Sequence, residues 1–259
     1  MPYETVSLYG GKITIEFNPA LHSYRRAGEK QAIISVTAAT GCLDKSRPLM
    51  IWAERLAREH YQEFFRNSKE TRYSQEQIEA MIEEAITKHK VKLVAAADSG
   101  TKVHDWAEQF MRSKVQGASA PSGFDGYSEG ELNGINAFID WYNSNEVEPV
   151  EIEKTIYSVK HNYVGRTDLI AKVNNRLLVC DYKTGKGIYG EAYYQNAAYW
   201  NAYEEETKAK IEGGLLLHFD KETGAFATKE ITPHVHGKNL PVFISLLTVK
   251  KREKEVSKY

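Results

Sequence analysis

The stretch that decides the fold is YVGRTDLIAKVNNRLLVCDYK, residues 163–183. It contains two β-rich runs separated by Asn174-Asn175, a pair that favours a tight turn between antiparallel strands. The second run, Leu177–Cys180, is continuously apolar, which is typical of a central strand, and it ends at Asp181. Asp181 and Lys183 are two residues apart, so on a strand both side chains leave the same face of the sheet.

Asp168 belongs to the first of these runs, and the turn can return it to a position beside Asp181. Two carboxylates and the Lys183 ammonium would then converge on one patch. Carboxylate oxygens can hold a hard divalent cation such as Mg²⁺ or Mn²⁺. A lysine there can orient a water or offset charge that develops on a phosphoryl group. The alternative is a cross-strand salt bridge on a solvated face, which the apolar run before Asp181 disfavours.

The pattern of the whole chain predicts a mixed α/β fold, with a central sheet flanked by helices. We expect N-terminal strands over residues 1–45, a helical region that includes His104 over 46–148, and a core over 149–259, together forming one integrated domain. Within the helical region we expect one helix from 74 to about 88 and another from 95 or 100 to 111. A short β-rich run is expected at 32–37, and the core order is βββ-α-β(β)-α.

Composition excludes several classes of protein. The chain has 259 residues with 34 Lys and Arg against 35 Asp and Glu, so it cannot coat nucleic acid by bulk charge, although an enzyme with a locally basic groove stays possible. Two cysteines, Cys42 and Cys180, cannot build a disulfide framework or a four-cysteine metal site, and we expect both to be free. The sequence shows no signal peptide and no apolar run of about 18 residues, so we expect an intracellular, cytoplasmic protein that does not enter a membrane.

Five elements in order resemble the RecB-like branch of the PD-(D/E)XK nuclease superfamily. They are Gly100-Thr-Lys-Val-His104, Gly165-Arg-Thr-Asp168, the apolar strand, Asp181-Tyr-Lys183-Thr-Gly and Gln195-Asn-Ala-Ala-Tyr199. The upstream His22-Ser-Tyr24 and Ser35-Val-Thr37 are similar to phage and prophage members of the branch and to the mitochondrial genome maintenance exonucleases. The resemblance covers about residues 20–205 and implies a restriction-endonuclease-like core.

The resemblance also implies roles for individual residues. The implied catalytic residues are Asp168, Asp181, Lys183, Gln195 and Tyr199. The implied ligands of Mg²⁺ or Mn²⁺ are His104, Asp168, Asp181 and the carbonyl of Tyr182. Supporting or DNA-binding roles are implied for Glu153, Arg166, Ser35 and Thr37. Members with an iron–sulfur cluster use four cysteines, so the resemblance is to the branch without that cluster.

The implied activity is metal-dependent hydrolysis of DNA from an end, with a preference for single strands or free ends, in replication, recombination or repair in a bacterial or phage-infected cell. A helicase or single-strand-annealing protein is the expected partner, and the oligomeric state is left open. Two alternatives remain: a structure-specific endonuclease with the same site, and a non-catalytic DNA-binding protein of this fold. Candidate stacking platforms for single strands are Trp52, Trp106, Tyr193 and Tyr194. His234-Val-His236 is interpreted as a strand-to-helix junction, not as a metal site.

Overall fold

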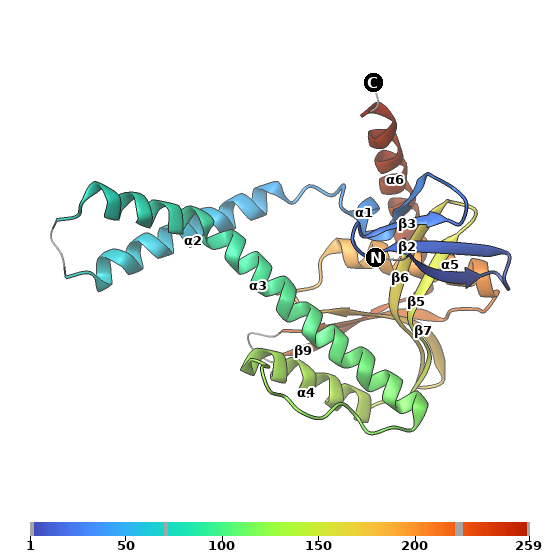
Figure 1. The fold of residues 1–259 in the computed structure, drawn as a ribbon. Helices are drawn as coiled ribbons and strands as arrows, with labels where there is room; N and C mark the ends of the chain where they lie inside the picture. The colour runs from blue at the N-terminus through green and yellow to red at the C-terminus, as the bar shows by residue number, and fades with distance from the viewer. Residues whose placement is uncertain (1–2, 70–71, 221–224, 258–259) are drawn as a thin grey trace. The chain divides into compact units, whose positions relative to one another are not determined.

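A computed structural model describes residues 3–69, 72–220 and 225–257. The chain forms two compact units, one made of residues 1–43 and 102–259 and the other of residues 44–101 (Figure 1). The expected division after residues 45 and 148 remains a prediction.

The larger unit is built on a mixed sheet, as the sequence predicts. Its strands, within the described part of the chain, are β1 (Glu4–Leu8), β2 (Ile13–Asn18), β3 (Ser23–Arg26), β4 (Ala32–Ser35), β5 (Val147–Ser158), β6 (Tyr163–Val173), β7 (Arg176–Lys183), β8 (Gly213–Phe219) and β9 (Phe226–Ile231). The strand order is β1-β2-β3-β4-β6-β7-β8-β9, and β5 pairs with β6. The pairs β4–β6 and β7–β8 are parallel and the others antiparallel. The chemically important strands β6 and β7 therefore lie inside the sheet.

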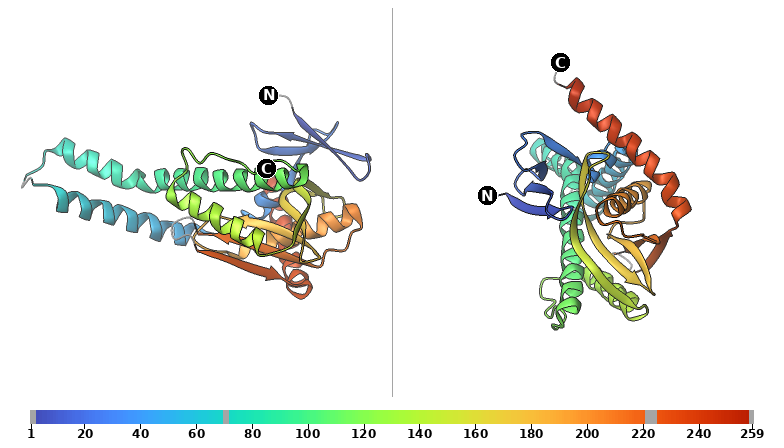
Figure 2. Two further views of the ribbon diagram at one scale, coloured as in Figure 1. Left: turned by 90° about the horizontal axis from the view of Figure 1, so that it is seen from below. Right: turned by 90° about the vertical axis from the view of Figure 1, so that its right-hand side faces the viewer.

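Helices cover both faces of this sheet (Figures 1 and 2). They are α1 (Val36–Thr40), α4 (Glu129–Asn143), α5 (Gly190–Thr207), α6 (Pro233–Val256) and the C-terminal part of α3 (Gln75–Gln116). Residues Leu169 and Cys180 face the core formed with α3 and α4, whereas Ile170 and Val179 face the core formed with α1, α5 and α6. This alternation is the period-two pattern of buried strands, and it confirms a sheet flanked by helices.

Two local expectations were wrong. The two helices expected at 74–88 and 95–111 are one continuous helix, α3, because the segment between them, His-Lys-Val-Lys-Leu-Val at 89–94, contains neither glycine nor proline to end a helix. The β-rich run 32–37 ends at Ser35, because the Ser35 hydroxyl accepts a hydrogen bond from the Ala38 amide and caps α1.

The smaller unit is a hairpin of two helices that lie side by side, α2 (Ser46–Asn67) and residues 75–101 of α3 (Figure 1). Its buried side chains include Leu56, Met81 and Ala85. Lys88 links the two helices through Glu63, at 3.5 Å, and His60, at 3.2 Å. The hairpin therefore has a narrow apolar contact supplemented by ion pairs.

Gly165 allows α5 to pack closely on β6. A Cβ atom at this position would lie 2.8 Å from Tyr199 Cε1 and 2.9 Å from Val36 Cγ2. We therefore expect Gly165→Ala to lower the free energy of unfolding by about 1–3 kcal/mol, the usual cost of overpacking. Chemical denaturation would measure this change. Gly187→Ala, where an added Cβ meets nothing within 4 Å, is the control, and equal effects of the two substitutions would contradict the packing argument.

Candidate active site

The candidate active site lies where strands β6 and β7 stop pairing and separate. Their ladder runs from Val173↔Arg176 to Leu169↔Cys180 and ends there. The next residues, Asp168 and Asp181, therefore stand at the opening. The Tyr182 amide, which has left the ladder with β6, donates a hydrogen bond of 2.7 Å to Asp168 Oδ2. Asp168 thus fixes the separation of the two strands while its carboxylate keeps further acceptor capacity.

Asp181 and Lys183 form a pair on one face of β7. Lys183 Nζ lies 2.5 Å from Asp181 Oδ2, and the Asp181 side chain is only 3% exposed. Burial raises the pKa of Asp181 to about 6, against the opposing effect of Lys183. Burial alone would lower the pKa of Lys183, but the charges of Asp181 and Asp168 outweigh it and raise that pKa. Lys183 is therefore a cation at neutral pH.

A short chain of polar side chains connects Lys183 to the last residue of α1, Thr40. Lys183 Nζ donates to Gln195 Oε1 at 3.3 Å, and Gln195 Nε2 donates to the buried Thr40 hydroxyl at 3.3 Å. Gln195 therefore positions the lysine. Tyr199, one turn further along α5, is 5% exposed and packs against Gly165. Burial raises the pKa of Tyr199, so its hydroxyl stays protonated.

Glu153 faces the same opening from β5. It has a φ of +51°, a left-handed conformation that is rare for a glutamate. It lies between the pairs Ile152↔Leu169 and Lys154↔Thr167, and hence opposite Asp168. Burial, followed by the charge of Asp168, raises the pKa of Glu153 to about 8.

His104 approaches from the other side. Its Nδ1 atom lies 3.9 Å from Asp168 Oδ2, and its ring meets the Tyr182 ring edge-on at 5.7 Å. The Tyr182 ring belongs to the core beneath α3 and α4, whereas Asp181 leaves β7 on the opposite face. His104 therefore lies nearest to Asp168, and it also interacts electrostatically with Asp181.

Ser35, Thr37 and Arg166 line a small pocket of about 130 Å³ together with Tyr199 and Gly165. The Ser35 and Thr37 hydroxyls are 3.2 Å apart. Arg166 is exposed, its ion pairs to Glu153 at 3.9 Å and to Glu4 at 3.8 Å are long, and its guanidinium lies 5.7 Å from the centre of the Phe17 ring. Its guanidinium is thus available to an anion at the edge of the opening.

The atoms that could bind a metal ion at the opening are carboxylate and carbonyl oxygens, the ligand type that hard divalent cations prefer. Asp181 Oδ2 is buried and meets no well-aligned hydrogen-bond donor in the described structure, although the Lys183 ammonium is close. The two acids and the Tyr182 carbonyl are oxygen ligands of the kind that Mg²⁺ prefers. Among the described residues, however, no three His, Cys, Asp or Glu side chains come close enough together to hold an ion. The structure thus brings the two acids together with the lysine, and His104 stands apart as a neighbour of Asp168.

Two residues that sequence reasoning missed support this site. His218 of β8 pairs in register with Lys183, and its Nε2 atom lies 2.5 Å from the Gly185 carbonyl oxygen, which anchors the loop after the lysine. Thr40 holds Gln195. His218 is the single polar side chain in the apolar run Leu215–Phe219, a signal that could have drawn attention to it. The sequence offers no comparable signal for Thr40.

Within the described structure, the remaining aromatic and histidine residues that the sequence singled out make no hydrogen bond or ion pair with the acids or the lysine of this site. Trp106 is buried in the core, Tyr193 and Tyr194 are half-buried, and His236 stacks on Trp200 within the first turns of α6. The two cysteines are unpaired. In the described part of the chain no helix combines the length and apolar character needed to cross a membrane.

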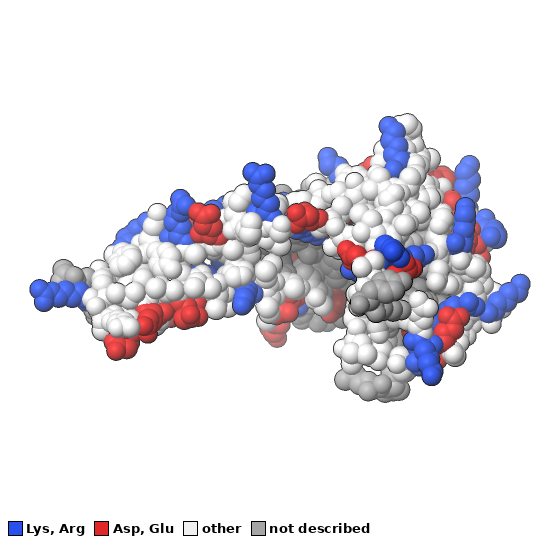
Figure 3. Space-filling view, turned by 90° about the horizontal axis from the view of Figure 1, so that it is seen from above, with Lys and Arg blue, Asp and Glu red and all other residues white. Residues whose placement is uncertain are grey.

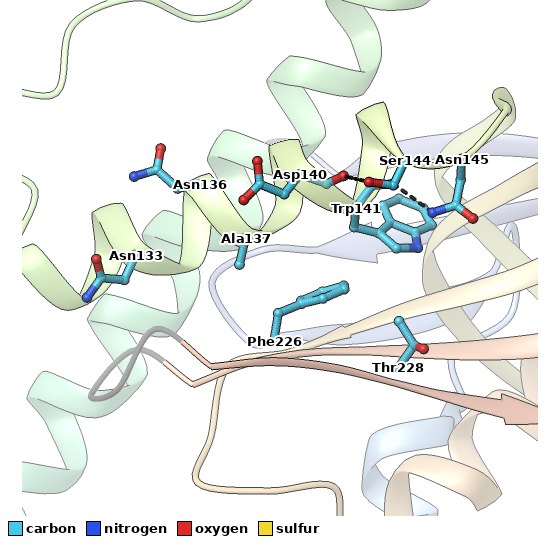
Figure 4. Close-up of a pocket in the computed structure, with 9 residues that line it drawn as sticks. All are labelled: Asn133, Asn136, Ala137, Asp140, Trp141, Ser144, Asn145, Phe226 and Thr228. Atoms are coloured by element: carbon cyan, nitrogen blue, oxygen red, sulfur yellow. Dashed lines mark hydrogen bonds between the residues drawn. The ribbon is translucent and has the colours of Figure 1, made fainter.

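An open groove of about 620 Å³ lies between α4 and β9 (Figure 4). Asn133, Asn136 and Asp140 line its helical side, and Phe226 and Thr228 its strand side. It contains none of the predicted site residues, so its size does not make it the catalytic site.

Comparison with known proteins identifies the family. The family model of the PD-(D/E)XK nuclease superfamily matches residues 52–239, and the chain belongs to this superfamily. The resemblance drawn from the sequence is thereby confirmed at the level of the superfamily, whose nucleases generally use divalent metal ions. A search of curated proteins finds no match to this sequence.

The solved structures that are similar to the chain include two described as exonucleases. One is a protein from Eubacterium rectale described as a candidate exonuclease, with 10% identity and a TM-score of 0.39, over 60% of this chain and 68% of that one. The other is an alkaline exonuclease from Laribacter hongkongensis, with 12% identity and a TM-score of 0.32, over 60% of this chain and 82% of that one. The assignment to the superfamily rests on the family model.

The half-buried carboxyl of Glu153 predicts a pH-dependent change in stability. Its folded pKa of about 8 exceeds the ordinary value of 4.5, so between these values the folded state holds a proton that the unfolded state releases. Stability contributed by this group is therefore lost as pH rises towards 8. In EDTA, we expect Glu153→Gln to be more stable than the parent protein by about 1–3 kcal/mol at pH 8.5 and nearly equal to it at pH 4.5.

Chemical denaturation at several pH values would measure this difference. Glu148→Gln, on the exposed part of the same strand, is the matched control. A difference between Glu153→Gln and the parent that does not change with pH would contradict burial of an uncharged Glu153.

Proposed function

We propose that the chain is a divalent-metal-dependent DNA exonuclease of the RecB-like branch without an iron–sulfur cluster. The observation that supports this most strongly is the ion pair of the buried Asp181 with the partly exposed Lys183 at 2.5 Å, beside Asp168 where β6 and β7 separate. A buried carboxylate with a second acid close by, at an opening in a sheet, is a costly arrangement for stability alone. It suits a reaction in which negative charge develops on a phosphate.

Asp168, Asp181 and the Tyr182 carbonyl would hold the metal ion, with His104 close to Asp168. When bound, Mg²⁺ or Mn²⁺ supplies Lewis-acid chemistry and a nucleophile at neutral pH. Without an ion, the two carboxylates would repel the substrate phosphate. Asp181, with its pKa raised to about 6 by burial, is ionised at neutral pH and available as a ligand.

Lys183 acts as a cation. Because its pKa is raised, it keeps its proton at neutral pH and can stabilise charge or donate a hydrogen bond, but it cannot serve as a base. Gln195 orients the ammonium, and Tyr199 forms the wall beside Gly165. Glu153, protonated at neutral pH, can donate a hydrogen bond in the same opening.

Arg166, Ser35 and Thr37 are proposed to contact the sugar–phosphate backbone at the edge of the opening. On the face that Figure 3 shows, basic side chains are spread over the surface and do not merge into one broad basic patch. DNA affinity at the catalytic opening should therefore be modest and depend on the divalent ion. We further propose a preference for single strands or free ends, and a role in replication, recombination or repair in the cytoplasm of a bacterial or phage-infected cell, with a helicase or single-strand-annealing partner.

The activity can be tested with an end-labelled single strand and a covalently closed circle of the same sequence, each with Mg²⁺, Mn²⁺ or EDTA. We expect stepwise shortening of the linear strand in the presence of a metal and none with EDTA. Lys183→Ala should reduce the rate at least about a hundred-fold, as the loss of preorganised charge stabilisation does elsewhere. Lys229→Ala, an exposed lysine on β9, is the control and should leave the rate unchanged.

Cutting of the circle would instead identify an endonuclease with the same site. DNA binding without metal-dependent cleavage of either substrate would identify a binding protein that keeps the nuclease fold.

A further inference from the structure

The helical hairpin carries a groove of about 310 Å³ that the proposed chemistry does not use. Leu49, Met50 and Trp52 of α2 line it, together with His89 and Leu93 of α3. All of these residues belong to the smaller unit. Met50 is 66% exposed and Leu93 is 46% exposed, so the groove presents apolar surface to solvent. Its volume falls in the range of small-ligand sites.

Charge is unevenly distributed along the hairpin. The two segments that form the groove, residues 45–53 and 85–97, contain five Lys or Arg residues and no Asp or Glu. The part between them, residues 54–84, contains five Lys or Arg and eight Asp or Glu. The groove therefore lies in the one acid-free part of a hairpin that is otherwise acidic, and its surroundings attract anions.

Lys90 and Lys92 flank the groove. His89 and Leu93 are four residues apart and share one face of α3, and at 3.6 residues per turn the two lysines lie about 80° to either side of that line. Both lysines are exposed, and in the described structure neither has an ion-pair partner. Lys88, by contrast, is engaged with Glu63.

Trp52 provides an aromatic surface in this groove. Of the four tryptophans it is the one that is half-exposed, since Trp106, Trp141 and Trp200 are each 6% exposed or less. An apolar floor with an aromatic ring and a cationic rim matches a ligand that is apolar along one side and anionic along the other. Single-stranded nucleic acid has this character, because its bases are accessible and its phosphates are charged. A duplex keeps its bases stacked inside.

We propose that this groove binds single-stranded nucleic acid, with bases against Trp52 and phosphates at Lys90 and Lys92. The inference rests on the proposed function, because it gives the substrate strand a second contact surface on the chain. Binding in this groove differs from binding at the proposed catalytic site, because it needs neither the metal ion nor the catalytic carboxylates.

Trp52 makes the proposal directly measurable. We expect oligo(dT) added to the full-length protein in EDTA to quench tryptophan fluorescence, and Trp52→Phe to remove most of that quenching. Trp52→Ala should weaken oligo(dT) binding by about five-fold to a hundred-fold, the effect of losing one stacking platform. The fluorescence of the three buried tryptophans should not respond.

A second variant tests the rim without disturbing apolar packing. Lys90→Gln combined with Lys92→Gln should reduce the slope of log affinity against log salt by about 1.4, which is two phosphate contacts on a single strand. With Mn²⁺, the same variant should raise KM for a long single strand and leave kcat unchanged. Lys229→Gln combined with Lys238→Gln removes the same charge from exposed positions outside the hairpin and should change neither quantity.

Unchanged oligo(dT) affinity and salt dependence in the hairpin variants would overturn the proposal, as would quenching by anionic lipid vesicles and not by oligo(dT). If the parent protein cleaves DNA and the hairpin variants bind and cleave DNA equally well, this inference alone is overturned. A parent protein that neither binds nor cleaves DNA would overturn the proposed function as well.

Discussion

The site depends on the burial of Asp181 against Lys183. Either charged group without the other would lower the stability of the fold, because a charge removed from water without a partner loses several kcal/mol of solvation free energy. β7 can hold the pair because β8 pairs with it as far as Lys183 and helices cover both faces of the sheet, so Asp181 is shielded from water. This shielding makes ionisation of Asp181 less favourable, because burial raises its pKa to about 6. The surrounding packing of α5 and β8 therefore maintains a charged pair that folding by itself does not favour.

The parting of β6 and β7 is the second constraint. A strand amide that leaves its ladder needs another acceptor, and Asp168 supplies it to Tyr182. Asp168 therefore has two effects. Its hydrogen bond to the Tyr182 amide fixes the distance between the separated strands, and its carboxylate adds negative charge to the opening. Asp181 on β7 and Glu153 on β5 respond to that charge, and it contributes to the raised pKa of each carboxyl. Three acids around one opening are tolerated because Lys183 and Arg166 oppose them and because Glu153 remains protonated.

Much of this arrangement follows from the sequence. The apolar run before Asp181 and the spacing of Asp181 and Lys183 predict a central strand with both groups on one face, and the Asn174-Asn175 turn predicts the antiparallel neighbour. The position of His104 does not follow, because it depends on which face of the sheet α3 covers. The left-handed conformation of Glu153 is also invisible in the sequence, because glutamate has no intrinsic preference for a positive φ and the residue interrupts the regular pairing of β5 with β6. The continuity of α3 was missed because Gly100 and the polar residues before it were given more weight than the helix-tolerant residues around them.

The hairpin shows how an average can conceal a local electrostatic feature. A formal net charge of −1 describes the whole chain, yet it combines an acid-free groove with an adjoining acidic segment. Screening limits the reach of exposed charges to about 8–10 Å at ordinary ionic strength, so a phosphate near Lys90 responds to its immediate neighbours and not to the total. For a nuclease whose catalytic opening is acidic without its ion, attraction of the substrate must come from such local cationic surfaces. The composition of the chain is therefore compatible with nucleic-acid binding, provided that its charges are considered segment by segment.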